Sequence, residues 1–505
     1  MKILFFHACA FNKAPLCELI DEAEKFAREG NEVFFAYCGG TMEGCFSNPV
    51  MNRLDCKVCS HSMRKSLKML DPSVKLMDLS KLAVNKLFDW QYDTAAEIKQ
   101  IKYKEVEIGY AVMSLYISTT RNLSPKIDAQ TKPYFDALLT SCATLVDAFA
   151  SAIDTVLPDK VCLFNGRYFE SRPALAVPRL RNIPTDVYEL IDGPDGKYRK
   201  VIFRNALPHN INALQSLMED GWNKSKKSLE EKIAIGKSFF EKRRNGIAAG
   251  DKVYVAGQTA GLLPEGWDET KCNIAIFNSS EDEFASIGTE FEKYSVYPSQ
   301  IEGIRSLLKR FAGDDKYHFY LRVHPNLGKI KYKYHLDLYK LDKEYDNITV
   351  IPAMDPISSY SLMDAAEKVV VFGSSMGVEA SYWKKPVILL SGSMYYNYDI
   401  CYKPKDEAQL VSLLRTENLP SKFDELSCCK YGFYILDKDR GEYKESYHYF
   451  NYNPFDVKIG GKVFHGTYCQ KMLGSRKLYA GYVAALREVA KLMSRPAHKI
   501  PKEEE

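Results

Sequence analysis

The clearest chemical signal in the chain is a glycine- and serine-rich segment that follows an apolar run. Residues 369–379 read VVVFGSSMGVE. The apolar run predicts a buried strand, and Gly-Ser-Ser-x-Gly is typical of a turn that opens a helix. Glycines let a ligand approach the backbone, and free N–H groups together with the hydroxyls of Ser374 and Ser375 favour a phosphate. We expect Gly377 to take part in this contact and Glu379 to bind the two hydroxyls of a ribose. The alternative is a serine helix cap with glycines that permit tight packing.

A second segment, Arg322-Val323-His324-Pro325-Asn326, also comes directly after an apolar run. Pro325 disfavours helix at the residue before it and holds His324 in an extended turn. Ligands of open α/β sheets bind beyond the carboxyl ends of the strands. We therefore expect His324 and Arg322 to contact a phosphate in the same site as the serines. The alternative is an ordinary histidine at a strand end.

A cluster of cysteines with the spacing C-x6-C-x10-C-x2-C lies near the N-terminus. Thiolates in such numbers can complete a tetrahedral zinc site or hold an iron–sulfur cluster. The segment between them is rich in turn residues, so a metal would stabilise it. Cys9 and Cys17 lie nearby and could replace a ligand. The expected structural metal ligands are Cys38, Cys45, Cys56 and Cys59, and the alternative is a loop with four free thiols.

Two successive series of alternating strands and helices must position these residues. The turn after the first strand lacks G-x-G-x-x-G, so no dinucleotide fingerprint is present there. The charged, helical stretch 212–250 is expected to connect the two series. Alternation of this kind predicts parallel sheets. The predicted strands are 2–6, 31–37, 160–164 and 184–190 in the first series, and 273–277, 319–323, 348–351, 369–372 and 387–390 in the second.

The length of 505 residues indicates two large domains or about three smaller ones. Hydrophobic residues make up 46% and charged residues 27%, an ordinary globular balance that excludes a disordered or fibrous chain. A net charge of +4 is too small to indicate a nucleic-acid partner. No run of 18 apolar residues occurs and the N-terminal apolar stretch is too short for a signal peptide. These features predict a cytoplasmic protein, and a peripheral association with the inner face of the membrane stays open.

Four motifs occur in order between residues 322 and 390: R-x-H-P, D-P-x-S-S-Y-x-L-x-x-A at 355–365, G-S-S-x-G-x-E-A at 373–380 and K-P-V-I-L-L. Together they resemble the capsular polysaccharide biosynthesis glycosyltransferases, which include bacterial Kdo transferases and, more distantly, polysialyltransferases. The resemblance implies an α/β protein of the GT-B fold, in which two Rossmann-like domains with parallel sheets face a cleft. It places a nucleotide-sugar donor on the C-terminal domain, against His324, Ser374, Ser375 and Glu379, and the acceptor on the N-terminal domain.

The domain boundaries expected from this resemblance are an acceptor-binding domain at 1–250, which carries the Cys-rich loop 38–59, and a donor-binding domain at 251–470. A long amphipathic helix at about 471–494 should cross back onto the N-terminal domain, followed by the charged tail to residue 505. The same helix could instead rest on an anionic membrane surface.

Inverting sugar transfer requires a group that takes the proton of the acceptor hydroxyl. The candidates lie at predicted strand ends in the N-terminal half. Two of them precede Gly193, similar to the acidic-acidic-Gly motif of polysialyltransferases, although the spacing E-L-I-D-G departs from it. Asn165 and Arg167, in F-N-G-R, are expected to face the acceptor. The candidate bases are Glu189, Asp192, Glu170 and, after them, His7.

The function expected from these observations is the transfer of a sugar from a nucleotide-sugar donor to a growing capsular or similar surface polysaccharide, by an inverting and metal-independent reaction. The acceptor would be an oligosaccharide or a lipid-linked glycan. Two alternatives stay open: a polyol-phosphate transferase with a CDP-linked donor, and a non-catalytic assembly scaffold. A carboxylate that faces the cleft across from His324 would distinguish an enzyme from a scaffold.

Overall fold

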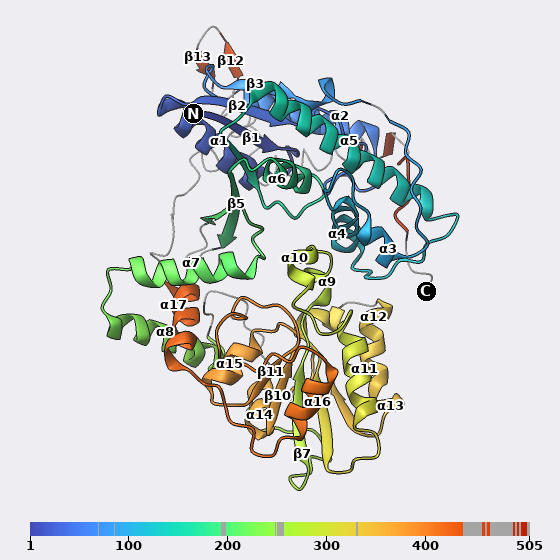
Figure 1. The fold of residues 1–505 in the computed structure, drawn as a ribbon, viewed down its shortest axis with the longest axis vertical. Helices are drawn as coiled ribbons and strands as arrows, with labels where there is room; N and C mark the ends of the chain where they lie inside the picture. The colour runs from blue at the N-terminus through green and yellow to red at the C-terminus, as the bar shows by residue number, and fades with distance from the viewer. Residues whose placement is uncertain are drawn as a thin grey trace.

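The computed structural model of the protein describes residues 1–68, 70–84, 86–192, 198–247, 249, 257–329, 332–437, 457–459, 462–464, 488–489, 492–493 and 496–501. Figure 1 shows two α/β units stacked along the long axis of the molecule, with the earlier half of the chain above the later half. The predicted α/β class with two parallel-sheet units is confirmed.

The N-terminal unit is built on a six-stranded sheet with the order β3-β2-β1-β4-β5-β6, which is the order of a doubly wound nucleotide-binding fold. All its strand pairs are parallel except β5 with β6. The sequence analysis did not anticipate β3 or β6. Both lie at edges of the sheet and carry charged residues, so neither shows a continuous apolar run. The strands are β1 (Lys2–His7), β2 (Glu32–Tyr37), β3 (Lys75–Asp78), β4 (Lys160–Phe164), β5 (Thr185–Asp192) and β6 (Tyr198–Arg204).

Helices cover both faces of this sheet, and α5 is the longest of those described. Among the described residues, α5 is the one helix whose length and apolar composition would allow it to cross a membrane. The sequence analysis expected no such helix. In the structure 72% of its apolar window is buried inside the protein, which is typical of a core helix. The helices are α1 (Lys13–Arg28), α2 (Arg53–Leu67), α3 (Ala95–Gln100), α4 (Ile108–Thr120), α5 (Lys132–Val156) and α6 (Ser171–Leu180).

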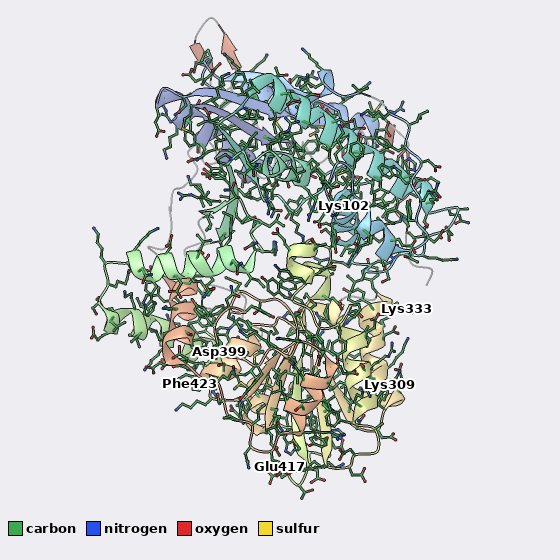
Figure 2. The ribbon with its side chains drawn as sticks, viewed as in Figure 1. Lys102, Lys309, Lys333, Asp399, Glu417 and Phe423 are labelled. Atoms are coloured by element: carbon green, nitrogen blue, oxygen red, sulfur yellow. The ribbon has the colours of Figure 1, made fainter. Side chains whose placement is uncertain are left out.

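The C-terminal unit has a five-stranded, wholly parallel sheet with the order β11-β10-β7-β8-β9. Its strands are almost entirely buried, as expected of strands covered on both faces. Charged side chains such as Lys309, Lys333 and Glu417 project from the outer surface of this unit (Figure 2). The strands are β7 (Cys272–Phe277), β8 (Tyr317–Arg322), β9 (Ile348–Ile351), β10 (Lys368–Val371) and β11 (Val387–Leu389).

Short helices follow most strands of the C-terminal unit, and two of them, α9 and α10, lie at the end nearest the N-terminal unit (Figure 1). A separate antiparallel hairpin is formed by β12 (Val457–Ile459) and β13 (Lys462–Phe464). The helices are α9 (Glu281–Phe284), α10 (Thr289–Glu292), α11 (Gln300–Arg310), α12 (Lys333–Leu336), α13 (Leu341–Glu344), α14 (Ser359–Ala365), α15 (Met376–Tyr382), α16 (Glu407–Arg415) and α17 (Glu425–Leu436).

Two helices between the sheets, α7 (Ile211–Lys224) and α8 (Leu229–Arg244), pack on the C-terminal unit (Figure 1). Phe239 and Phe240 share a buried cluster with Tyr431 of α17. The backbones of α8 and α17 approach so closely that a Cβ at Gly236 would lie 2.4 Å from the Cys429 carbonyl oxygen. The expected domain boundary at residue 250 thus falls after two helices that pack with the C-terminal unit.

The predicted crossover helix at 471–494 lies mostly outside the described residues. The described end of the chain nevertheless contacts the N-terminal unit. Tyr116 donates a hydrogen bond of 3.0 Å to the Pro501 carbonyl, and the ring of His498 packs against Tyr134. The end of the chain therefore lies on the unit with which it began.

Candidate functional site

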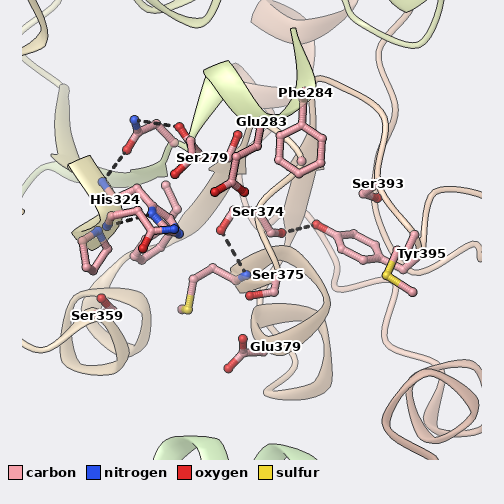
Figure 3. Close-up of a pocket in the computed structure, with 18 of the residues that line it drawn as sticks. Ser279, Glu283, Phe284, His324, Ser359, Ser374, Ser375, Glu379, Ser393 and Tyr395 are labelled. Atoms are coloured by element: carbon pink, nitrogen blue, oxygen red, sulfur yellow. Dashed lines mark hydrogen bonds between the residues drawn. The ribbon is translucent and has the colours of Figure 1, made fainter. Parts of the chain in front are cut away.

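A cavity of about 510 Å³ opens at the carboxyl ends of β7, β8 and β10. Its walls include the segments after all three strands, and Figure 3 shows His324, Ser374, Ser375 and Glu379 around it. The β6–α7 connection and α8 also line the cavity, through His209 and Arg243. The structure thus brings together the two motifs that the sequence analysis assigned to one phosphate site.

His324 is held in place by Asn278, which directly follows β7, and by a residue of its own turn. Its backbone N–H donates to Asn278 Oδ1 at 2.8 Å, and its ring Nδ1 accepts the Asn326 N–H at 3.2 Å. Because Nδ1 is an acceptor, the neutral ring carries its proton on Nε2. The imidazole can therefore donate a hydrogen bond to an anionic ligand.

The turn between β10 and α15 forms the floor of the cavity with Gly373, Ser374 and Ser375. Gly373 has a φ of 76°, and a Cβ there would lie 2.7 Å from the Gly392 carbonyl oxygen, so only glycine fits this turn. The Ser374 carbonyl accepts the Tyr395 hydroxyl at 2.5 Å, while Ser374 Oγ accepts the Met376 N–H at 3.3 Å. These contacts fix the turn and keep both serines at the cavity.

Gly377 does not line this cavity. A Cβ at Gly377 would lie 2.2 Å from the Tyr395 hydroxyl oxygen and 2.9 Å from Val371 Cγ2. The glycine therefore allows α15 to pack closely on β10 and on Tyr395. This agrees with the alternative in which the glycines of the motif permit tight packing. The expected contact of Gly377 with a ligand was wrong for that reason.

Glu379 lines the cavity but is fully buried, with an exposed fraction of 0%. Its Oε1 accepts a hydrogen bond of 3.0 Å from Arg243 Nε, and its Oε2 accepts the Tyr360 hydroxyl. The Arg243 guanidinium also lies 3.4 Å from Ser375 Oγ. Both carboxylate oxygens are thus engaged inside the protein, and the expectation that Glu379 binds ribose hydroxyls needs correction. It anchors α8 beneath the serine turn.

Arg322 also lines the cavity, yet its terminal nitrogens are directed at the backbone. Nη1 donates to the Pro352 carbonyl, and Nη2 donates to the Asp355 carbonyl at 3.0 Å. Burial is the main cause of the lowered pKa of this guanidinium. Arg322 therefore holds the β9–α14 connection at the end of β8. Its hydrogen bonds go to the backbone and not, as expected, to a phosphate.

Two residues that the sequence analysis did not single out line the cavity and are capable of acid–base chemistry. Glu283, on the short helix α9, is solvent-exposed and points into the cavity that also holds His324 and Ser374 (Figure 3). His209 comes from the β6–α7 connection, and burial followed by the charge of Arg167 lowers its pKa to about 3. No local motif surrounds either residue, so only the fold could reveal them.

Among the N-terminal candidates, Asn165 and Arg167, which follow β4, form a cluster with Glu189 of β5 outside the lining of this cavity. Asn165 Nδ2 donates to Glu189 Oε2 at 2.8 Å, and burial raises the pKa of Glu189 to about 7. The Arg167 N–H donates to Asn165 Oδ1 at 3.0 Å. Glu189 is therefore a half-buried carboxyl that titrates near neutral pH, as a general base requires.

Arg167 connects this cluster to the cavity. Its guanidinium donates to the Glu283 carbonyl at 2.7 Å and to the Ala285 carbonyl at 3.4 Å, and burial lowers its pKa. The side chain was expected to face the acceptor. Instead it spans the two units and holds α9, from which Glu283 enters the cavity.

The other N-terminal candidates lie apart from Glu189 in their contacts. Glu170 accepts the Phe46 N–H at 3.4 Å, and burial, with a contribution from Cys9, raises its pKa to about 7. His7 is buried, its Nε2 has no hydrogen-bond partner, and burial lowers its pKa to about 4. Asp192 ends β5, and its side chain lies outside the described part of the structure.

The expected metal ligands do surround one small cavity, of about 20 Å³. However, among the described residues no group of three or more histidine, cysteine, aspartate or glutamate side chains is arranged to hold a metal ion. A tetrahedral zinc site needs four ligands at about 2.0–2.3 Å from one point. Cys38, Cys45, Cys56 and Cys59 line the same small cavity without forming such a group, and a structural metal at these cysteines stays a prediction.

Residues 290–404 match the family model described as capsule polysaccharide biosynthesis protein. The matched range includes His324, Ser374 and Ser375, and it confirms the resemblance drawn from the four motifs. No curated protein matches the chain at the significance required.

Solved structures similar to the chain include the β-Kdo 2,4-transferase of KpsC from Thermosulfurimonas dismutans, at 14% identity and a TM-score of 0.32, over 55% of this chain and 78% of that chain. The β-Kdo 2,7-transferase of the same KpsC has 14% identity and a TM-score of 0.32, over 64% and 86%. The UDP-GlcNAc 2-epimerase from Neisseria meningitidis, bound to UDP-GlcNAc, has 10% identity and a TM-score of 0.23, over 85% and 98%.

Proposed function

We propose that the protein is a GT-B glycosyltransferase that moves a sugar from a nucleotide-sugar donor to a growing surface polysaccharide, with inversion and without a catalytic metal. The observation that carries this proposal is the single cavity in which His324 and the Ser374–Ser375 turn lie together at the carboxyl ends of three parallel strands. The family match over residues 290–404 supports the connection to capsule polysaccharide.

The donor phosphate lies, in this proposal, between His324 and the serine turn. The Nε2–H of His324 and the serine hydroxyls donate hydrogen bonds to the phosphate oxygens as the bond to the sugar breaks. Donors fixed in advance at a developing negative charge stabilise the transition state more than the ground state. The buried Arg243–Glu379 pair keeps Ser375 in position for this contact.

For the proton of the acceptor hydroxyl, we assign Glu283 as the base. A base must reach the reacting hydroxyl before its pKa matters. Of the two carboxylates that line the same cavity as His324, Glu379 is buried and engaged by Arg243 and Tyr360, whereas Glu283 is exposed. Glu189 and Glu170 are absent from the lining. The sequence analysis named a carboxylate facing His324 as the feature that distinguishes an enzyme from a scaffold, and Glu283 supports the enzyme.

The partners follow from this chemistry. The donor is a nucleotide-linked sugar, the acceptor is an oligosaccharide or a lipid-linked glycan, and nucleic acid is not a partner. The reaction takes place on the cytoplasmic side, where nucleotide sugars are available, with peripheral contact to the membrane where the acceptor is lipid-linked.

Nucleotide screening tests the proposal directly. Wild-type protein is heated with UDP, CDP, GDP and CMP in turn, in the presence of EDTA, and the midpoint of unfolding is measured. One of these nucleotides should raise the midpoint, because a ligand that binds only the folded state stabilises it, and the rise should vanish in His324→Ala. The measurement is then repeated with nucleotide sugars and with a CDP-linked polyol, and preferential stabilisation by the CDP-polyol would favour the polyol-phosphate transferase instead. No stabilisation by any of them would contradict the donor site.

A further inference from the structure

The short helix α9 presents one face to the cavity that holds His324. Ser280, which directly precedes α9, and Glu283 and Phe284 within it all line this cavity. We propose that this face of α9, together with His209, binds the terminal sugar ring of the acceptor, with one ring hydroxyl beside Glu283. The inference rests on the proposed function, because it takes Glu283 as the base.

The spacing of the three residues places them together. Ser280 is the N-cap of α9, and Glu283 and Phe284 lie three and four residues after it. Positions three and four residues apart lie on one face of a helix. In Figure 3 Glu283 and Phe284 extend from α9 into the space beside the serine turn. A hydroxyl, a carboxylate and an aromatic ring can therefore contact the same ligand.

Ser280 has a buried hydroxyl that its protein surroundings leave unsatisfied. The residue is 3% exposed, and among the described residues its Oγ has no hydrogen-bond partner. Although Ser280 precedes a helix, its side chain makes no capping hydrogen bond. A buried polar group without a partner is destabilising, so a ligand that forms a hydrogen bond to it gains affinity. The hydroxyl therefore favours a ligand that carries polar groups.

A second unsatisfied group comes from the connection between β6 and α7. The Nδ1 atom of His209 is buried and has no hydrogen-bond partner within the part of the chain that the structure describes. Burial, followed by the charge of Arg167, lowers the pKa of His209 to about 3. The ring is therefore uncharged at neutral pH, so it offers a hydrogen bond and not an ion pair. A hydroxyl group, which both donates and accepts, suits such a ring.

Phe291 connects His209 to the face of α9. Its ring centroid lies 6.0 Å from that of Phe284, with the two rings stacked, and 6.5 Å from that of His209, with the rings at 85°. The Phe284 side chain is half-buried and lines the cavity. A sugar ring has apolar C–H groups on its faces and hydroxyls at its edge. Its face can pack on Phe284 while its hydroxyls bond to the unsatisfied groups of Ser280 and His209.

The position of Glu283 favours the acceptor over the donor sugar. Glu283 and Phe284 are consecutive, so a ring packed on Phe284 presents its edge to the Glu283 carboxylate. A base must lie within hydrogen-bond reach of the hydroxyl whose proton it takes. The proposed phosphate groups, His324 and the serine turn, belong to other segments of the cavity wall. The sugar beside Glu283 is therefore the one that supplies the reacting hydroxyl.

Saturation-transfer difference NMR on the full-length protein tests this inference. The method detects protons of a weakly bound ligand that touch the protein. The probes are the methyl glycosides of glucose, galactose and N-acetylglucosamine, without nucleotide. At least one should give a signal with the wild type. Phe284→Leu and Ser280→Ala should each weaken its binding by about fivefold or more, the effect of one lost contact. No signal from any of the three probes overturns the inference.

Two matched variants control for general effects of substitution. Ser359→Ala changes a serine of α14 that lines another part of the same cavity, and Phe423→Leu changes a half-buried phenylalanine outside it. Both should keep the wild-type signal. Ser280→Ala removes no hydrogen bond of the described residues, so its midpoint of unfolding should be no lower than that of the wild type. If the control variants weaken binding as much as Phe284→Leu and Ser280→Ala, the inference is overturned.

Nucleotides separate this inference from the proposed function. UDP, CDP, GDP and CMP should stabilise Phe284→Leu and Ser280→Ala as they do the wild type. Loss of that stabilisation would assign the face of α9 to the nucleotide and overturn the inference. A wild type that binds a glycoside but none of the nucleotides would contradict the donor site and still support the sugar site.

Nucleotide sugars distinguish the acceptor sugar from the donor sugar. The glycoside signal of the wild type is measured again with UDP-glucose, CDP-glucose, GDP-mannose and CMP-N-acetylneuraminate, and with the corresponding nucleotides. The signal should persist in every case, because the donor and the acceptor bind together. A probe displaced by a nucleotide sugar but not by its nucleotide would place the donor sugar on Phe284 and overturn the assignment to the acceptor.

Discussion

Arg243 and Glu379 form a buried ion pair across 136 positions of the sequence, with Arg243 Nε at 3.0 Å from Glu379 Oε1. Arg243 lies in the last turn of α8, and Glu379 lies in the first turn of α15, just after the serine turn. The pair therefore ties the connection between the two units to the floor of the cavity. This ion pair explains why an acidic residue follows Gly-Ser-Ser-x-Gly, which the motif alone does not explain.

The first prediction concerns this pair. Removal of one partner leaves a buried charge unpaired, so Arg243→Ala or Glu379→Ala should lower the free energy of unfolding by about 3–5 kcal/mol. The double variant Arg243→Met/Glu379→Leu should lose clearly less, because it leaves no unpaired charge. Chemical denaturation of all three variants measures the difference. A double variant as unstable as the sum of the single variants would contradict the pairing.

The second prediction concerns the donor site. His324→Ala should abolish nucleotide binding and transfer while leaving the fold intact, since the backbone N–H of residue 324 still reaches Asn278. Calorimetric titration with the nucleotide that stabilises the wild type gives the affinity. His318→Ala is a matched control, because His318 lies on β8, the strand that precedes His324, hydrogen-bonds Thr349 and does not line the cavity. Equal affinities in the two variants would remove His324 from the site.

The third prediction concerns the base. Glu283→Gln should remove most of kcat and leave donor affinity nearly unchanged, because proton abstraction contributes only in the transition state. Glu189→Gln and Glu170→Gln are measured beside it. If Glu283→Gln keeps activity within about tenfold while one of the other two loses it, the base lies in the N-terminal unit, as the sequence analysis expected.

Local patterns predicted the parts of the site that lie within one strand–turn–helix unit. The run 369–379 forms β10, the serine turn and α15, and the turn at His324 follows β8. The partner of Glu379 could not be predicted from the sequence. Arg243 belongs to a charged helix whose residue pattern indicates solvent-exposed side chains on most of its faces. Glu283 was missed for a related reason: α9 has four residues and enters the cavity only through contacts between the units.

Contacts with distant parts of the chain also explain the site residues whose roles the sequence analysis predicted wrongly. Arg322 and Arg167 were read as free charges at strand ends, whereas both donate to backbone carbonyls of distant segments. A glycine spacing does not tell a ligand contact from close packing, and Gly377 packs against Tyr395. The cysteine spacing predicts a metal site, but it could not show that amides of the turn after β1 donate to the sulfurs of Cys9 and Cys59.

The fourth prediction is a dependence of stability on pH. Burial raises the pKa of Glu189 from about 4.5 to about 7. Between these two pH values the carboxyl is therefore protonated in the folded state and ionised in the unfolded state. Stabilisation from the protonated carboxyl is complete below about pH 4.5 and is lost as pH rises through about 7, by up to about 3 kcal/mol. Unfolding of the wild type and of Glu189→Gln at pH 5 and pH 8 measures it. The variant should lose less stability over this interval, and parallel curves would contradict the raised pKa.

The last prediction concerns the contact between the units at Arg167. Its guanidinium donates to the Glu283 carbonyl at 2.7 Å, and so it fixes the helix from which the proposed base enters the cavity. Arg167→Ala should therefore lower kcat by about tenfold or more, which corresponds to about 1.4 kcal/mol of lost positioning, and should change donor affinity little. Arg179→Ala is the matched control, because Arg179 pairs with Glu290 of α10 at 3.4 Å on a more exposed part of the same contact. Exposed ion pairs contribute little, so this variant should keep nearly full activity. If both variants lose activity equally, the loss reflects a general loosening of the two units, and Arg167 has no particular part in placing Glu283.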